Sequence, residues 1–261
     1  MLLLAAIAFV IVMWSTSTAV IFYLDSLPAH TFKYSMAAAT LVLIGCSIAM
    51  VLLEDQSSTE AIATSFAAGL LAWGWTEMAL YMGYITGPRK KRCAEGCSGL
   101  QHFGHAVNAN LWHEIVVIIF AIVIYLSANE TSLWAYTMLW LMHLSARLNV
   151  FLGVRNVSAE FVPEHMDVLK GFLRQRTMNP LFPFSCLILI ALTGYLMSST
   201  QTFAMTMAAT LASIGLLEHV LLMLPLPIEK MWAWSLSNRV ETENVETKAD
   251  HHRHTAVGAL L

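Results

Sequence analysis

The stretch HFGHAVNANLWHE, residues 102–114, runs directly into the apolar segment 115–126, and this junction decides the fold. Polar side chains of the types that bind metals therefore enter a segment with the composition of a membrane helix. An ionisable group inside a bilayer costs several kcal/mol, so such groups are interpreted as functional by default. The stretch therefore predicts a membrane helix that carries a polar site.

The composition indicates an integral membrane protein. The chain is 57% hydrophobic and 12% charged, whereas a soluble domain carries about 25% charged residues. Its apolar residues form long runs separated by short polar clusters. The net charge is −3 and no nucleic-acid-binding motif is present, so membrane lipids rather than nucleic acid are the expected surroundings. The apolar run from Met1 to Leu24 lacks a basic start, which favours a spanning helix over a cleaved signal peptide.

The apolar runs predict an all-α, polytopic membrane helix bundle with about seven spans of roughly 20 residues each. The predicted spans are 1–24, 34–53, 61–85, 106–127, 133–153, 182–199 and 203–225. Lys and Arg outside these spans fall only in the first, third and fifth connections and in the tail. By the positive-inside rule the N-terminus is then outside and the C-terminus inside the cell.

The domain organisation follows from the same pattern. Residues 1–240 are predicted to form one seven-helix transmembrane domain. Its fifth connection contains a predicted surface helix at about 163–177, with Pro and Glu at its start and apolar residues at helical spacing. Residues 241–261 are charged and poor in large apolar side chains, so we predict a disordered cytoplasmic tail.

Ionisable residues on four predicted helices share one depth. At a rise of 1.5 Å per residue they lie roughly 10 Å inside the cytoplasmic boundary. Carboxylates and imidazoles from several helices resemble a di-iron site in ligand type, although the paired Glu-x-x-His motif is absent. The alternative is a buried ion-pair network around Arg147 that fixes helix packing. The candidate metal ligands are Glu77, His113, Glu114, Glu164, His165, Glu218 and His219, with Arg147, Asn149 and His143 as supporting groups.

A second group of candidate ligands precedes the fourth predicted span. Cys93 and Cys97 flank a short turn, and His102 and His105 follow. Two thiols and two imidazoles form a candidate zinc set, although the Cys-x-x-x-Cys spacing matches known sites weakly. The alternative is a turn with reduced thiols. The two histidines share a helix face only if the helix begins before them.

Several multi-residue blocks occur in a fixed order along the chain. They are 85–89, 95–99, 102–107, 148–154, 161–165, 178–183, 218–219 and 224–227. In these blocks the chain from about Trp73 to Trp234 resembles the photosynthetic complex assembly protein 2 (PuhE-type) family of purple phototrophic bacteria. The first two helices match only in character, the tail after Arg239 lies outside the resemblance, and His143 departs from the residue types expected in relatives.

The resemblance implies a multi-pass protein of the cell inner membrane that supports photosynthetic complex assembly and modulates bacteriochlorophyll supply. Its implied partners are photosynthetic complexes or pigment-biosynthesis enzymes. The molecular activity of the family is left open by the resemblance.

Two classes of function remain. The first is a non-enzymatic assembly or pigment-handling factor, in which imidazoles ligate the magnesium of bacteriochlorophyll and apolar helices hold a hydrophobic pigment or precursor. The second is a membrane di-iron oxygenase or desaturase acting on a tetrapyrrole or carotenoid, whose iron would need open positions for oxygen. The number of carboxylates favours the second class over simple pigment ligation. A transporter is disfavoured because inverted repeats and broken helices are absent.

Overall fold

A computed structural model describes residues 1–261 except 95, 128–129, 158–161, 163, 199–201 and 225–261. The described elements are α1 (Leu2–Asp25), η1 (Ala29–Thr31), α2 (Phe32–Leu52), α3 (Thr59–Tyr81), α4 (Gly99–Ser127), α5 (Glu130–Leu152), η3 (Glu164–Met166), α6 (Asp167–Lys170), α7 (Leu181–Ser198) and α8 (Phe203–Leu221). Among these residues the only extended pairing is an isolated parallel bridge between Val154 and Gln175. The predicted all-α fold class is confirmed.

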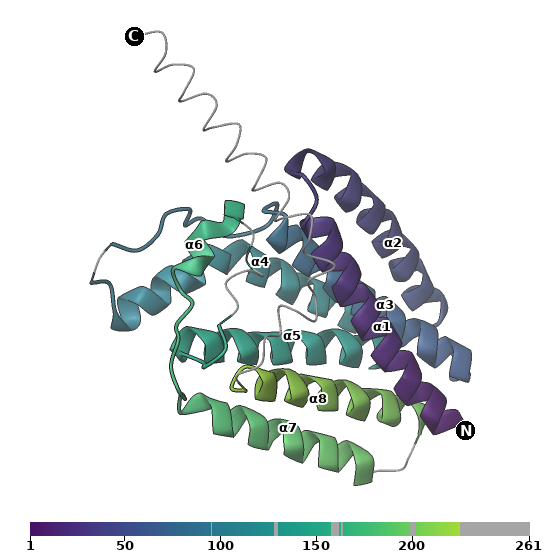
Figure 1. Cartoon of the computed structure of the whole chain (residues 1–261). Helices are drawn as coiled ribbons and strands as arrows, with labels where there is room; N and C mark the ends of the chain where they lie inside the picture. Colours follow the sequence, from purple (N-terminus) through teal and green to yellow (C-terminus); the bar gives the residue numbers. More distant parts are fainter. Residues whose placement is uncertain (95, 128–129, 158–161, 163, 199–201, 225–261) are drawn as a thin grey trace.

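The long helices form a bundle in which the chain reverses direction at each connection (Figure 1). At its centre α3 packs against α1, α2, α4 and α5, while α5 also packs against α7 and α8. The first and last helices, α1 and α8, lie against each other. The core between these helices includes Phe66 of α3, Tyr136 of α5 and Leu211 of α8, each at most 2% exposed.

The outer surface of the bundle is suited to lipid. Among the described residues, five segments are long and apolar enough to cross a membrane: α1, η1 together with α2, α4, α7 and α8. Large apolar side chains such as Leu41, Ile122 and Ile188 project from them and are exposed. The helices α3 and α5 have 23 residues each and are less apolar than these five segments. The count of seven spans and the outward N-terminus stay predictions.

Some of the predicted boundaries need correction. The fourth long helix begins at Gly99 rather than at residue 106. The surface helix predicted at 163–177 is confined to η3 and α6 and ends at Lys170. Beyond it the backbone N–H groups of Arg174 and Arg176 donate to the carbonyls of Val150 and Val154, at 3.3 and 2.9 Å, so the chain is extended there. The predicted disordered tail 241–261 lies outside the described residues.

The separation of α3 and α5 is set by a close backbone contact. A Cβ atom on Gly69 of α3 would lie 3.0 Å from the Cα of Ser132 on α5. The Ser132 hydroxyl donates to the carbonyl of Ser65 at 2.9 Å, one turn away. Because these two helices also carry Glu77 and His143, this contact helps to position the polar groups described next.

Candidate functional site

Three helices bring Glu77 of α3, His113 of α4 and His143 of α5 together inside the bundle. The two oxygens of Glu77 lie 3.4 Å from Nε2 of His113 and 3.4 Å from Nε2 of His143. Glu77 and His113 are buried, with 6% and 1% of their side chains exposed. Neither contact has hydrogen-bond geometry, so one Glu77 oxygen, both nitrogens of His113 and Nε2 of His143 lack a hydrogen-bond partner. Two buried ionisable groups and the partly buried His143 therefore converge with unused donor and acceptor atoms.

Glu114 follows His113 in the chain but has different partners. It forms an ion pair with Arg147 of α5 and accepts a hydrogen bond of 3.3 Å from Nε1 of Trp140. Both charged side chains are about three-quarters buried. Adjacent residues on a helix point about 100° apart, which explains why Glu114 does not join Glu77. This pair fits the predicted network around Arg147.

A cavity of about 270 Å³ lies beside Glu77, between α1, α3, α5 and α8. Its polar lining includes the side chains of Glu77, His143 and Glu218. Trp14 and Trp73 contribute aromatic walls, and the Trp73 ring meets the His143 ring edge-on at 5.5 Å. Glu218 is exposed on α8, so it reaches the cavity from its outer side. The cavity thus combines an apolar wall with two carboxylates and one imidazole.

His219 is turned away from this cavity and belongs to a hydrogen-bonded network. Its Nδ1 donates to the carbonyl of Gly215 at 2.7 Å, so its Nε2 accepts from the Ser145 hydroxyl at 2.9 Å. The Ser185 hydroxyl of α7 lies 3.0 Å from Ser145 and accepts from the Asn149 amide at 3.0 Å. Both ring nitrogens of His219 are therefore occupied: Nδ1 within α8, and Nε2 in the contacts that join α8 to α5 and, through Ser185, to α7.

The remaining predicted pair lies near the end of the bundle. His165 donates from Nε2 to the carbonyl of Tyr81 at 2.7 Å, and its ring lies 5.7 Å from that of Phe32. Glu164 precedes it in η3. The structure therefore places His165 against the end of α3 and does not bring it to Glu77. The metal role predicted for these residues stays a prediction.

The connection after α3 folds back along α4. The backbone N–H of His113 donates to the carbonyl of Thr86 at 3.0 Å. A Cβ atom on Gly87 would meet the backbone of Asn108 and Ala109, so this approach requires glycine. The same connection then leads to Cys93, which links the position of the cysteine turn to the helix that carries His113.

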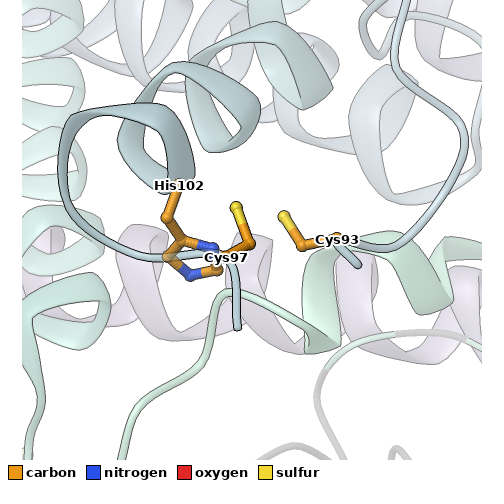
Figure 2. A group of neighbouring side chains, drawn as sticks. All are labelled: Cys93, Cys97 and His102. Carbon is orange, nitrogen blue, oxygen red and sulfur yellow. The ribbon is translucent and has the colours of Figure 1, made fainter. Parts of the chain in front are cut away.

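The cysteine turn and the first turns of α4 form a second polar cluster. The sulfur atoms of Cys93 and Cys97 and one ring nitrogen of His102 all lie within 4.8 Å of one another (Figure 2). Nδ1 of His105 lies 3.2 Å from the Cys93 sulfur and 3.4 Å from the Cys97 sulfur. Desolvation raises the pKa of the Cys97 thiol, and the neighbouring Cys93 adds to the rise. Because α4 begins at Gly99, both histidines lie on the helix.

Aromatic rings and an ion pair connect this cluster to the rest of the same end of the bundle. The His102 ring stacks on Phe151 of α5 at 5.4 Å and lies 5.1 Å from Phe172. Arg92 forms an exposed ion pair with Asp167 of α6, and its guanidinium lowers the pKa of that carboxyl. The cluster is thus attached to α4, α5 and α6 together.

Comparison with known proteins shows to which family the chain belongs. The model of a family described as "Protein of unknown function (DUF3623)" matches residues 1–243. The chain belongs to this family. A relative from Rhodobacter capsulatus, named "Uncharacterized 30.4 kDa protein in puhA 5'region", is 32% identical over 249 residues, which cover 89% of this chain and 90% of the relative. No solved structure was found to match.

The matched residues include both polar clusters: the one around Glu77 and the one formed by the cysteine turn and the start of α4. Two features of the site were missed by sequence reasoning. The first is the part played by α1, whose Ser17 and Thr18 line the cavity. The available signal was the row of four consecutive hydroxyl residues, 15–18, inside a long apolar run. The second is the Ser145–Ser185 contact, for which no signal exists in the sequence because serine is common in membrane helices.

Proposed function

We propose that this protein is an inner-membrane factor that supports assembly of photosynthetic complexes and the supply of bacteriochlorophyll. Its resemblance to the PuhE-type assembly family supports this role. The name of its relative, which refers to the 5' region of puhA, points in the same direction. In this proposal the protein handles a hydrophobic pigment or pigment precursor and passes it to a partner in the membrane.

The observation that carries the proposal is the cavity between α1, α3, α5 and α8. Sites for small molecules are mostly apolar and aromatic, with a few placed polar groups, and measure about 300–1,000 Å³. This cavity of about 270 Å³ has that lining, and its volume lies just below that range. In this proposal the cavity receives one end of a large apolar molecule, with the His143 ring as a polar contact in its wall and Glu218 at the outer side. The rest of such a molecule would extend into lipid.

The oxygenase alternative has less support from the described residues. A di-iron site needs carboxylate and imidazole atoms that converge on the same ions. Glu77 lies between His113 and His143, but Glu114 pairs with Arg147 and does not join Glu77 as a second carboxylate ligand. Among the described residues, the group whose ligand atoms all lie within 4.8 Å of one another is Cys93, Cys97 and His102. Thiolates are not the donors of a di-iron carboxylate site, so the assembly factor is the better supported of the two functions.

The test is the pigment content of the full-length protein purified in mild detergent from a phototrophic host. We expect bacteriochlorophyll or a precursor to co-purify, identified by its absorption spectrum. His143→Ala should lower the pigment-to-protein ratio at least tenfold, and Gly74→Leu should do the same by filling the cavity. His30→Ala, at an exposed position in η1, is the matched control.

A deletion strain tests the cellular role separately. Loss of the protein should lower the levels of bacteriochlorophyll and of assembled photosynthetic complexes. Normal levels of both would overturn the assembly role. A pigment-free wild-type protein, or a His143→Ala variant with full pigment, would overturn the assignment of the cavity.

A further inference from the structure

Two cysteines and two histidines lie close together at the end of the bundle where α4 begins. The sulfurs of Cys93 and Cys97 and a nitrogen of His102 lie within 4.8 Å of one another. Nδ1 of His105 lies 3.2 and 3.4 Å from the two sulfurs. In a tetrahedral zinc site, with Zn–S of about 2.3 Å and Zn–N of about 2.0–2.1 Å, sulfur and nitrogen ligands lie about 3.5 Å apart. The observed sulfur–nitrogen distances match that spacing.

The surroundings of His102 provide a second, independent observation. Its Nδ1 is buried and has no hydrogen-bond partner. A buried polar atom without a partner is unfavourable by about 1–3 kcal/mol, and native proteins rarely keep one without a reason. The ring is nevertheless held in place by stacking on Phe151 and by contact with Phe172. An imidazole fixed by packing beside two thiols is prepared to bind a metal.

The backbone between the ligands supports the same conclusion. Gly96 and Gly99 have φ angles of 80° and 60°, so the turn from Cys97 into α4 uses conformations that favour glycine. His102 and His105 are separated by three positions and share one face of the helix. The turn therefore returns both thiols to the face that carries both imidazoles.

We propose that Cys93, Cys97, His102 and His105 bind one zinc ion. Two thiolates and two imidazoles are a common donor set of structural zinc sites, and zinc prefers this set to the hard oxygen ligands of magnesium or calcium. All four positions are filled by protein, so the ion holds structure together and has no open position for a substrate. The site is separate from the cavity at His143, and it does not depend on the proposed function.

The zinc ion would join the connection after α3 to the start of α4. Through Phe151 and Phe172 it also supports the end of α5 and the segment that follows α6. Arg92 lies next to Cys93 and reaches Asp167, so the ion pair and the metal brace the same face. Zinc binding therefore orders the end of the bundle at which the basic connections lie.

The first experiment measures metal in the full-length protein purified in detergent with zinc in the growth medium. We expect about one zinc ion per chain by mass spectrometry of the metals. Cys93→Ser, Cys97→Ser and His105→Ala should each lower zinc at least fivefold. Cys46→Ser and His30→Ala should leave it unchanged, because these residues lie away from the cluster. Replacement by cobalt should give the thiolate-to-cobalt absorption of a tetrahedral site, which Cys97→Ser should abolish.

A second measurement distinguishes zinc from a disulfide. With zinc bound, Cys93 and Cys97 should resist a maleimide reagent and become reactive after a chelator is added, without reductant. Thiols that react only after reduction would show a disulfide and overturn the proposal. A protein without metal and with freely reactive thiols would overturn it, and so would undiminished zinc in the Cys93→Ser/Cys97→Ser variant. If one of these variants fails to accumulate, His105→Cys is tested in its place. This variant keeps a zinc ligand at position 105, so it should retain the metal.

Discussion

The ion pair of Arg147 and Glu114 can show whether the polar groups around Glu77 form a packing network or a metal site. If the cluster is a packing network, Arg147 neutralises a carboxylate that would otherwise stay charged among apolar side chains. If Glu77, His113 and His143 bind a cation, that cation supplies the main positive charge. Removing Arg147 therefore has different consequences in the two cases.

For a packing network, Arg147→Met should destabilise the protein by about 3–5 kcal/mol, because it leaves Glu114 without its counter-charge. The double variant Glu114→Gln/Arg147→Met should recover most of that loss. Lys33→Met, at an exposed position, is the control. The measurements are membrane abundance by immunoblot and the thermal midpoint in detergent. A stable Arg147→Met protein, together with a metal that is lost in His113→Ala, would refute the network.

Sequence reasoning found the residue types of the polar layer and failed to find which of them meet. Depth along each helix followed from chain position, but the rotation of each helix about its axis did not. In the structure, helix rotation brings Glu77 to His113 and His143, and Glu114 to Arg147. His143, the candidate that departed most from the resemblance, is one of the central residues. The cysteine turn had a weak spacing signal, because the approach of its two sulfurs to α4 is a tertiary contact.

The next larger feature is the contact between the two central helices. Gly69 allows α3 to approach the backbone of α5 at Ser132. Gly194 of α7, by contrast, has no atom within 4 Å of an added Cβ, so a methyl group there is free of steric conflict. These two glycines form a matched pair for separating packing from helix propensity.

Gly69→Ala should lower stability by about 1–3 kcal/mol, as overpacking does in other well-packed interiors. Gly194→Ala should be neutral or stabilising by up to about 1 kcal/mol, since alanine favours helix. Thermal unfolding in detergent measures both, and the rank order of the two midpoints is the result that matters. Equal midpoints would show that α3 and α5 do not approach as closely as described.

Asn179 joins the start of α7 to the end of α5. Its side-chain oxygen accepts from the backbone N–H groups of Leu181 and Phe182, both at 3.0 Å. Its amide donates to the carbonyls of Asn149 and Gly153 at 3.2 and 2.8 Å. Asn179→Asp keeps the cap oxygen and loses the two amide hydrogen bonds. Asn179→Ala loses the cap as well as the amide hydrogen bonds. We expect the alanine variant to be less stable than the aspartate variant by at least the ~1 kcal/mol of a helix cap, and therefore to have the lower thermal midpoint. Equal midpoints would show that the cap adds nothing.

The helix boundaries illustrate the limit of periodicity. Apolar runs located every long helix to within a few residues, apart from the start of α4. There the polar turns from Gly99 onward lie beyond the apolar run and are stabilised by contacts with the preceding connection. The surface helix was overestimated for a similar reason, since pairing with the end of α5 replaced its second half.

For the molecule as a whole, the distribution of basic residues predicts its orientation. A cytoplasmic reporter enzyme fused after Arg239 should be active, and the same reporter at Ser57 should be inactive. A reporter that works only outside the cytoplasm should give the opposite pattern. Cytoplasmic activity at Ser57, between α2 and α3, would exclude the seven-span arrangement.

The cavity has one wall from α1 and another from α8, the first and last helices among the described residues. Ribosomes add about 5–20 residues per second, so the roughly 180 residues between α1 and α8 take roughly 10–40 seconds to make. During that interval α1 stays in the bilayer without its partner, and lipid covers the face that α8 later occupies. The cavity therefore cannot be complete before α8 is made. An occupant must be in the surrounding membrane when α8 arrives, or it must enter afterwards by separating α1 from α8.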